Sequence, residues 1–139
     1  MLYHGPEYIL RECYAAWSRA DYDAALSYCS DDVVFAMYLP KDVVPFGGEA
    51  HGLEEFRGCL KAILKDFEHV YYRPLNIVVS GQFGRAQIHF CFRHRATGRE
   101  LDGVMRHEVM IKDNKIASMR EYHDTERIRA FMQLTAASK

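Results

Sequence analysis

The stretch LDGVMRHEVMIKDNKIASMREYHD, residues 101–124, has the pattern of two strands joined by a tight polar turn at residues 112–115. Asp113 and Asn114 supply the turn chemistry, because their side chains tolerate turn dihedrals and bond their own backbone. If Ile111 pairs with Ile116, the alternation of side chains along strands fixes which residues share each face of this hairpin.

That register predicts two faces of different character. The first face carries Met105, His107, Val109, Ile111, Ile116, Ser118, Arg120 and Tyr122. The second face carries Val104, Arg106, Glu108, Met110, Ala117, Met119, Glu121 and His123. Arg106 would then lie opposite Glu121, at cross-strand contact distance. Charged groups among methionines are unusual on a buried face, so the burial of this second face decides what the protein does.

The composition indicates one ordinary globular domain over residues 1–139. This length supports a real hydrophobic core, and 49% hydrophobic with 27% charged residues is typical of folded proteins. The formal net charge of -1 argues against a nucleic-acid binder, which usually carries a basic excess. No apolar run reaches membrane-spanning length, and the first residues lack the features of a signal peptide. We therefore expect a cytoplasmic protein with no nucleic-acid or membrane partner.

The cysteines and histidines predict no metal site. Cysteines stand at positions 13, 29, 59 and 91, without the close spacing of metal ligands, and are expected to be reduced and mostly buried. Among the seven histidines, His89, His107 and His123 fall in adjacent predicted strands but do not share a face in this register. No cofactor motif is present, so neither metal nor cofactor is expected.

The rest of the chain predicts helices first and strands afterwards. Pro6 opens a first helix, Asp21 caps a short second one, and Asp124 caps a closing helix. The other expected elements are a strand at 33–39, a loop at 40–52, a helix at 53–67 and strands at 69–80 and 85–95. A loop as long as 40–52 is often a lid or a pocket rim. This order is typical of an α+β domain whose helices pack on one face of the sheet.

Four stretches carry a resemblance to a known family: YAAWSRADYDAAL, SDDVVF, ATGREL and KDNKIASMREYHD. Together they resemble the nuclear transport factor 2-like superfamily, and within it the SnoaL-like polyketide cyclase and ketosteroid-isomerase-like group. The resemblance implies an α+β roll, in which three N-terminal helices pack over the concave face of a cone-shaped, curved, mixed or antiparallel sheet. This fold hosts isomerases, cyclases, hydrolases and non-catalytic binding modules, so it does not by itself give the function.

The resemblance also implies an internal pocket between the concave face and the first helix. The catalytic residues predicted there are Glu121, His123 and Arg106. The predicted substrate-binding residues are Tyr14, Trp17, Phe35, Met37, Glu108 and Met119. Glu121 stands where SnoaL-like cyclases resemble one another in having a catalytic aspartate. Met37 and Arg106 stand about where ketosteroid isomerases place their base and their acidic donor, so steroid isomerisation is not expected.

Each candidate has a structural interpretation as well as a catalytic one. Burial of Glu121 would raise its pKa towards the range of general acid–base catalysis, whereas Arg106 would lower it and form a structural ion pair. His123 is either a second base or a histidine bonded to water at the pocket mouth. His107 lies on the opposite face in this register and would be catalytic only if the register slips by one residue.

Two hypotheses follow. The first is a cofactor-independent acid–base enzyme that binds a small, largely apolar carbonyl compound for cyclisation, isomerisation or hydrolysis. Glu121, with His123, would move a proton next to the carbonyl, and Arg106 would stabilise the enolate oxygen. The second is a non-catalytic ligand-binding or dimerisation module. We also expect a homodimer through the outer sheet face, which in this register carries Val109, Ile111, Ile116 and Tyr122.

Overall fold

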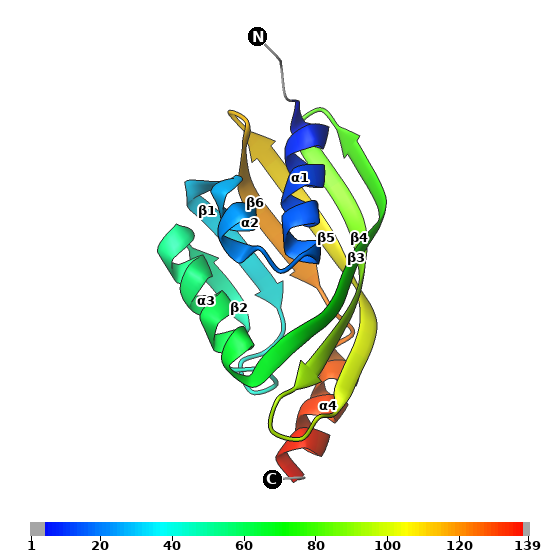
Figure 1. Ribbon diagram of the computed structural model, residues 1–139. Coiled ribbons are helices and arrows are strands. Elements are labelled where there is room, and N and C mark those ends of the chain that lie inside the picture. Colours follow the sequence, from blue (N-terminus) through cyan, green and yellow to red (C-terminus); the bar gives the residue numbers. More distant parts are fainter. Residues whose placement is uncertain (1–4, 138–139) are drawn as a thin grey trace.

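The computed structural model describes residues 5–137 and consists of one curved six-stranded sheet with helices against it (Figure 1). The helices are α1 (Pro6–Ser18), α2 (Tyr22–Ser27), α3 (Leu53–Asp66) and α4 (Thr125–Ala137). The strands are β1 (Cys29–Tyr38), β2 (Gly48–His51), β3 (Phe67–Ser80), β4 (Phe83–His94), β5 (Glu100–Lys112) and β6 (Lys115–Tyr122). Their order across the sheet is β2-β1-β6-β5-β4-β3, with β1 and β6 parallel and the other neighbours antiparallel.

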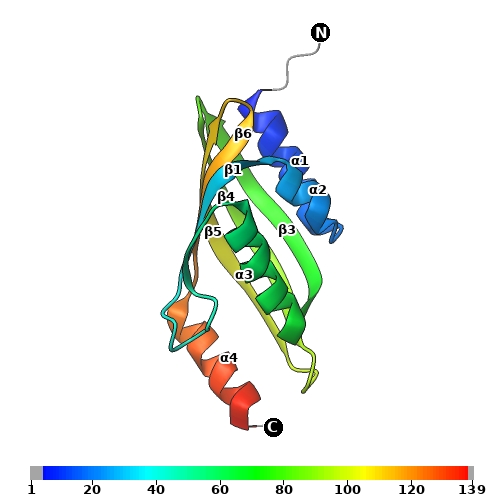
Figure 2. The same ribbon diagram turned by 90° about the vertical axis from the view of Figure 1, so that its left-hand side faces the viewer.

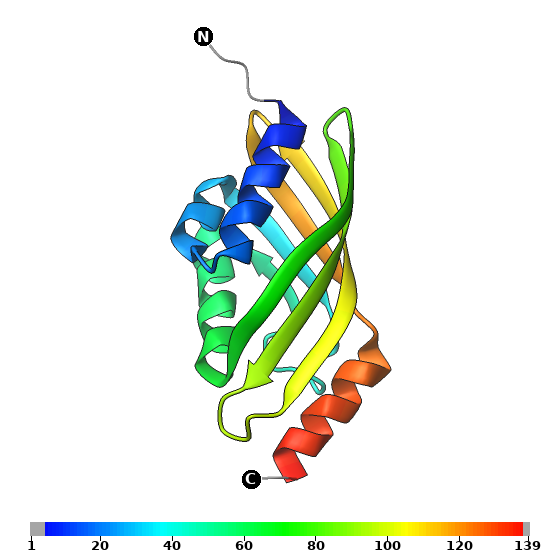
Figure 3. The same ribbon diagram turned by 45° about the vertical axis from the view of Figure 1, so that its right-hand side comes forward.

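The helices α1, α2 and α3 all lie on one side of the sheet, its concave side (Figure 2). α4 follows β6 and lies at the end of the molecule opposite to the start of α1 (Figure 3). This is the α+β architecture predicted from the order of helices and strands. The close seating of α1 depends on Gly84 in β4, where a Cβ atom would stand 2.6 Å from Cδ2 of Leu10.

Both predicted aspartate caps are confirmed. The Asp21 carboxylate accepts a hydrogen bond of 3.2 Å from the backbone N–H of Ala24, at the start of α2. The Asp124 carboxylate accepts one of 3.2 Å from the backbone N–H of Arg127, in the first turn of α4. Each cap satisfies a backbone donor that the first turn of a helix leaves without an internal partner.

The segment predicted as a loop over residues 40–52 contains a short strand, so that prediction was wrong at its end. β2 pairs antiparallel with β1, with Val34 opposite His51 and Met37 opposite Gly48. Three glycines, two prolines and a glutamate give the 40–52 segment little strand propensity of its own. Its strand conformation comes from hydrogen bonding to β1, which is a tertiary contact rather than a local preference.

The hairpin of β5 and β6 contains a β-bulge that the sequence did not reveal. Ile111 pairs with Ile116 as predicted, but Met110 pairs with Ser118, which leaves Ala117 as the extra residue. Beyond the bulge every pair is displaced by one position, so that His107 lies opposite Glu121 and not opposite Arg120. One extra residue moves all later side chains of a strand to the other face. The predicted pairing of Arg106 with Glu121 was therefore wrong.

The concave face of the hairpin combines residues that the predicted register had placed on separate faces. It carries the buried residues Met105, His107, Val109, Ile111, Ile116, Met119 and Glu121. Val109, Ile111 and Ile116 are at most 2% exposed and belong to the core, so their predicted place on the outer face was wrong, whereas Tyr122 does lie on that face, opposite Arg106. The convex face carries Arg106, whose guanidinium lies 4.8 Å from the centre of the Tyr122 ring.

All four cysteines are free, and three of them are buried, as expected. Cys59 is half-buried, and its Sγ lies 3.7 Å from the carbonyl oxygen of Phe46. Across residues 5–137, no helix is both long enough and apolar enough to pass through a membrane.

Candidate functional site

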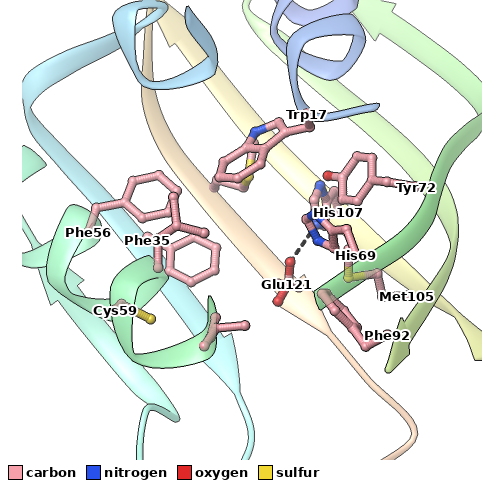
Figure 4. A pocket seen from close by; sticks show the side chains of 13 residues that line it. Trp17, Phe35, Phe56, Cys59, His69, Tyr72, Phe92, Met105, His107 and Glu121 are labelled. Carbon is pink, nitrogen blue, oxygen red and sulfur yellow. Dashed lines mark hydrogen bonds and ion pairs between the residues drawn. The ribbon is translucent and has the colours of Figure 1, made fainter. Parts of the chain in front are cut away.

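A small cavity lies between the concave face of the sheet, α1 and α3 (Figure 4). We call it the front cavity, and its volume is about 60 Å³. Its lining residues are Trp17, Phe35, Phe56, Cys59, Leu60, Ile63, His69, Tyr72, Phe92, Met105, His107, Met119 and Glu121. The Phe35 and Phe56 rings are stacked, with their centres 4.4 Å apart. Almost all of this wall is apolar or aromatic, which suits a largely apolar ligand.

Glu121 is the acidic residue of the front cavity, and two histidines hold its carboxylate. Oε1 lies 2.9 Å from Nε2 of His107, a contact drawn in Figure 4. Oε2 lies 2.9 Å from Nε2 of His123. The two contacts come from different directions, because His107 stands on the neighbouring strand β5 and His123 follows Glu121 by two residues. Glu121 itself is only 7% exposed.

The two histidines keep Glu121 ionised. Burial alone would raise its pKa, but the hydrogen bonds from His107 and His123, together with the electrostatic attraction between these groups and the carboxylate, outweigh burial. The net result is a pKa well below the usual range of a glutamate. A carboxylate that is ionised at neutral pH accepts hydrogen bonds and protons but has no proton to donate. Glu121 is therefore suited to be a base rather than an acid.

His107 is locked in place by a partner at each ring nitrogen. Its Nδ1 lies 2.9 Å from the hydroxyl of Tyr14, on α1. The ionised Glu121 can only accept, so Nε2 of His107 donates, and in the neutral ring Nδ1 accepts the Tyr14 O–H. Burial raises the pKa of Tyr14 well above that of an ordinary tyrosine, so this hydroxyl keeps its proton. His107 is 1% exposed and positions Glu121 rather than meeting a ligand through a free nitrogen.

Two further polar side chains point at the front cavity. His69 stacks on Phe92 with ring centres 4.6 Å apart, and its Nδ1 lies 2.6 Å from the Tyr22 hydroxyl. Burial lowers the pKa of His69 to about 4, although the charge of Glu121 opposes part of this change, so the ring is neutral at pH 7. Tyr72 turns its hydroxyl oxygen towards the cavity (Figure 4), and burial raises its pKa well above the ordinary value. Both are neutral groups.

A second cavity, which we call the rear cavity, lies between α4, the 39–46 segment and the sheet. Its volume is also about 60 Å³. Its lining residues are Met37, Leu39, Val44, Phe46, Ile63, Phe67, Phe90, Phe92, Leu101, His123, Ile128, Phe131 and Met132. Ile63 and Phe92 line both cavities, so they form the wall between them. The imidazole of His123 thus connects Glu121 of the front cavity with the lining of the rear cavity.

The predicted site residues fall into four groups. Trp17, Phe35, Met119 and Glu121 line the front cavity, and Met37 and His123 line the rear cavity. Tyr14 lies behind the wall, where it bonds His107.

Arg106 and Glu108 are exposed on the convex face, so placing them in the pocket was wrong. The bulge at Ala117 is the physical reason. His69 and His107 were not selected as site residues from the sequence. For His107, the sequence indicated only that it would face the pocket if the register of the hairpin shifted by one residue.

The sequence over residues 10–119 matches the family model described as SnoaL-like domain. The chain belongs to the SnoaL-like family. The match covers α1 to the middle of β6 and so includes Tyr14, Trp17, His69 and His107, while Glu121 and His123 lie just beyond it. No curated protein matches the sequence.

Solved structures resemble this SnoaL-like protein in fold. An NTF2-like protein of unknown function from Burkholderia pseudomallei has a TM-score of 0.80 at 19% identity, covering 91% of this chain and 96% of that one. A candidate SnoaL-like polyketide cyclase from Mesorhizobium loti has a TM-score of 0.72 at 19% identity, covering 86% and 99%. A protein with a ketosteroid isomerase-like fold from Catenulispora acidiphila, in complex with trimethylamine, has a TM-score of 0.72 at 14% identity, covering 86% and 88%. These likenesses confirm the NTF2-like α+β fold.

The SnoaL-like site contains donors and acceptors for protons rather than a metal-binding set. Within residues 5–137, no three side chains among histidine, cysteine, aspartate and glutamate are grouped so as to hold a metal ion. His107 uses both ring nitrogens on protein partners, which leaves none for a ligand. The chemistry that the arrangement supports is proton transfer to and from Glu121 in an apolar cavity.

Proposed function

We propose that this SnoaL-like protein binds a small, largely apolar carbonyl compound in the front cavity and transfers a proton at the carbon next to the carbonyl. The observation that carries the proposal is the ionised Glu121 carboxylate in the wall of an apolar cavity. The surrounding wall is apolar or aromatic, so a carboxylate facing a bound C–H group there is a competent base.

In the proposed reaction, Glu121 removes the proton from the carbon, and the electrons of the broken C–H bond move towards the carbonyl oxygen. The Tyr72 hydroxyl, which faces the cavity and keeps its proton, is the donor that stabilises the resulting enolate oxygen. Glu121 then returns a proton to the same carbon, which gives exchange once its proton has been replaced from solvent, or to another carbon, which gives isomerisation. In a substrate with a second carbonyl group, the enolate carbon can instead attack that carbonyl carbon and close a ring, and the proton from Glu121 goes to the carbonyl oxygen. Arg106, exposed on the convex face, has no part in this scheme.

The low pKa of Glu121 limits the choice of substrate. A carboxylate with a depressed pKa is a weaker base than an ordinary one, so it needs a carbon acid of raised acidity. We therefore propose substrates in which the reacting carbon lies between a carbonyl group and an aromatic ring or a second carbonyl group.

The exchange of protons of 2-tetralone in D₂O, followed by proton NMR, tests this function. The wild-type protein is expected to accelerate the exchange at the carbon between the ring and the carbonyl. Glu121→Gln should reduce the acceleration at least about 100-fold, which is the usual contribution of a general base. Glu108→Gln, exposed on the convex face of β5, is the matched control and should keep the wild-type rate.

A non-catalytic binding module is the second candidate, and one observation favours it. Both oxygens of Glu121 are already hydrogen-bonded to histidines, as in a purely structural network. In that case 2-tetralone would bind to the wild-type protein and to Glu121→Gln with similar affinity, and neither would accelerate exchange. That result would overturn the catalytic proposal and leave the ligand-binding one.

A further inference from the structure

The rear cavity and the front cavity meet at one thin partition. Ile63 from α3 and Phe92 from β4 line both of them, and no other residue is shared between the two linings. His123, which lines the rear cavity, is bonded to Glu121, which lines the front cavity. The two cavities are therefore neighbours along the concave face rather than independent hollows.

The volumes show that neither cavity holds a ring-sized ligand alone. Each measures about 60 Å³, whereas a cavity of about 150 Å³ is known to bind benzene. A ring placed beside Glu121 must therefore gain space by displacing side chains. Ile63 and Phe92 are the residues whose movement joins the two cavities, and neither is fully buried. Met37, Met105, Met119 and Met132 line one cavity or the other, and methionine side chains adapt readily to a ligand.

The charges of the linings restrict the chemistry of the ligand. Neither lining contains a lysine or an arginine, so nothing there would neutralise a phosphate or a carboxylate. The rear cavity has only apolar and aromatic side chains apart from His123. Burying a charged group in such surroundings without a partner is strongly unfavourable. The ligand that fits is neutral, with its polar atoms at the end near Glu121.

We infer that the rear cavity is a second subsite for the same ligand, which is an extended, neutral molecule with an apolar second ring. The reactive carbonyl end lies beside Glu121, and the apolar end passes between Ile63 and Phe92 to pack against α4. This inference rests on ligand binding in the front cavity as proposed above, but it does not require catalysis. α4 then sets how long a molecule the protein accepts.

Calorimetry with phenol and 4-phenylphenol, whose phenol ring mimics an enol, tests the subsite. In the wild-type protein the second ring should lower the Kd at least about tenfold, because it buries apolar surface in the rear cavity. Met132→Trp, which fills the rear cavity from α4, should remove this gain and leave the Kd of phenol unchanged. Gln133→Trp is the matched control on the exposed side of the same helix and should keep the gain.

Leu101→Phe fills the rear cavity from β5 and repeats the test if Met132→Trp does not fold. Equal affinities for the two phenols in the wild-type protein, or a tighter binding of 4-phenylphenol that survives both filling substitutions, would overturn the subsite and leave the proposed reaction standing. If 4-phenylphenol binds more tightly and the filling substitutions remove this difference, but 2-tetralone exchange is not accelerated, the subsite would be supported and the reaction overturned. Absence of binding by either phenol would overturn the subsite together with the binding site in front of it.

Discussion

At the scale of the residue, Arg106 and His107 show how much depends on a single position. The two are neighbours in β5, yet Arg106 lies exposed on Tyr122 and His107 is buried against Glu121. Because His107 and not Arg106 lies beside Glu121, the predicted ion pair is replaced by a chain of hydrogen bonds that runs from Tyr14 through His107 to Glu121 and His123.

The charge state of His69 leads to a prediction about pH. Its pKa is lowered to about 4 in the folded protein, chiefly by burial, and would be about 6.5 in the unfolded chain. Between these values the unfolded chain binds more protons, so stability rises with pH and is lost on acidification through this window. His69→Asn keeps a polar group near Tyr22 but does not titrate. It should reduce the loss of unfolding free energy between about pH 7 and about pH 5 by at most about 2 kcal/mol.

Urea denaturation of the wild-type protein and of His69→Asn at the two pH values measures this difference. His51→Asn, at an exposed position of β2, is the control and should leave the pH dependence of stability as in the wild-type protein. Identical pH dependence in all three proteins would show that His69 is not held neutral by burial.

At the scale of the element, the bulge of β6 decides which side chains enter the cavity. Ala117 is the extra residue, and the parallel pairing of β1 with β6 also shifts register near it, between Cys29 and Val34. The bulge therefore fits β6 to two neighbours at once. It lets Ile116 remain in the core at one end while Glu121 remains in the concave face at the other.

Deletion of Ala117 is expected to destabilise the protein by about 2 kcal/mol. The pairs of β6 with β5 would stay in register without the extra residue, but β6 would be one residue too short to keep both its Cys29–Ile116 and its Val34–Ser118 pairs with β1. Ala117→Ser keeps the bulge and should change the unfolding free energy by less than about 1 kcal/mol. A deletion variant with wild-type stability in urea would show that the bulge is dispensable for the fold.

At the scale of the whole molecule, the convex face of the sheet remains open to solvent and apolar in part. Its exposed apolar side chains are Tyr38, Leu75, Val78, Phe83, Val104 and Met110. Phe83 is 60% exposed and lies opposite Met110 in the pairing of β4 with β5. Exposed apolar patches of this kind often mark interfaces. We therefore retain the proposal of a homodimer through the outer sheet face, with these residues in place of the buried Val109, Ile111 and Ile116.

The dimer leads to a prediction for light scattering. The wild-type protein should show about twice the mass of one chain, and Phe83→Glu should reduce it to that of one chain because a charge would be buried at the interface. Lys61→Glu, on the exposed side of α3 and so on the opposite side of the sheet, should leave the dimer intact. A monomeric wild-type protein would remove the proposal.

The sequence by itself determined the helices and the longer strands, and their order, but not β2. Helical periodicity, the aspartates at 21 and 124 and the alternation of β4 and β5 come from local preferences, and these were sufficient to predict an α+β domain and the Ile111–Ile116 pair, while the resemblance to a known family added the curved roll. Glu121 was also selected from the sequence, and it does line the cavity. Only the tertiary structure decided which side chains accompany it. β2 and the bulge at Ala117 are set by pairing with strands far away in the chain, and alanine gives no local signal for a bulge. Because side chains alternate with a period of two, the extra residue Ala117 places His107, and not Arg106, beside Glu121.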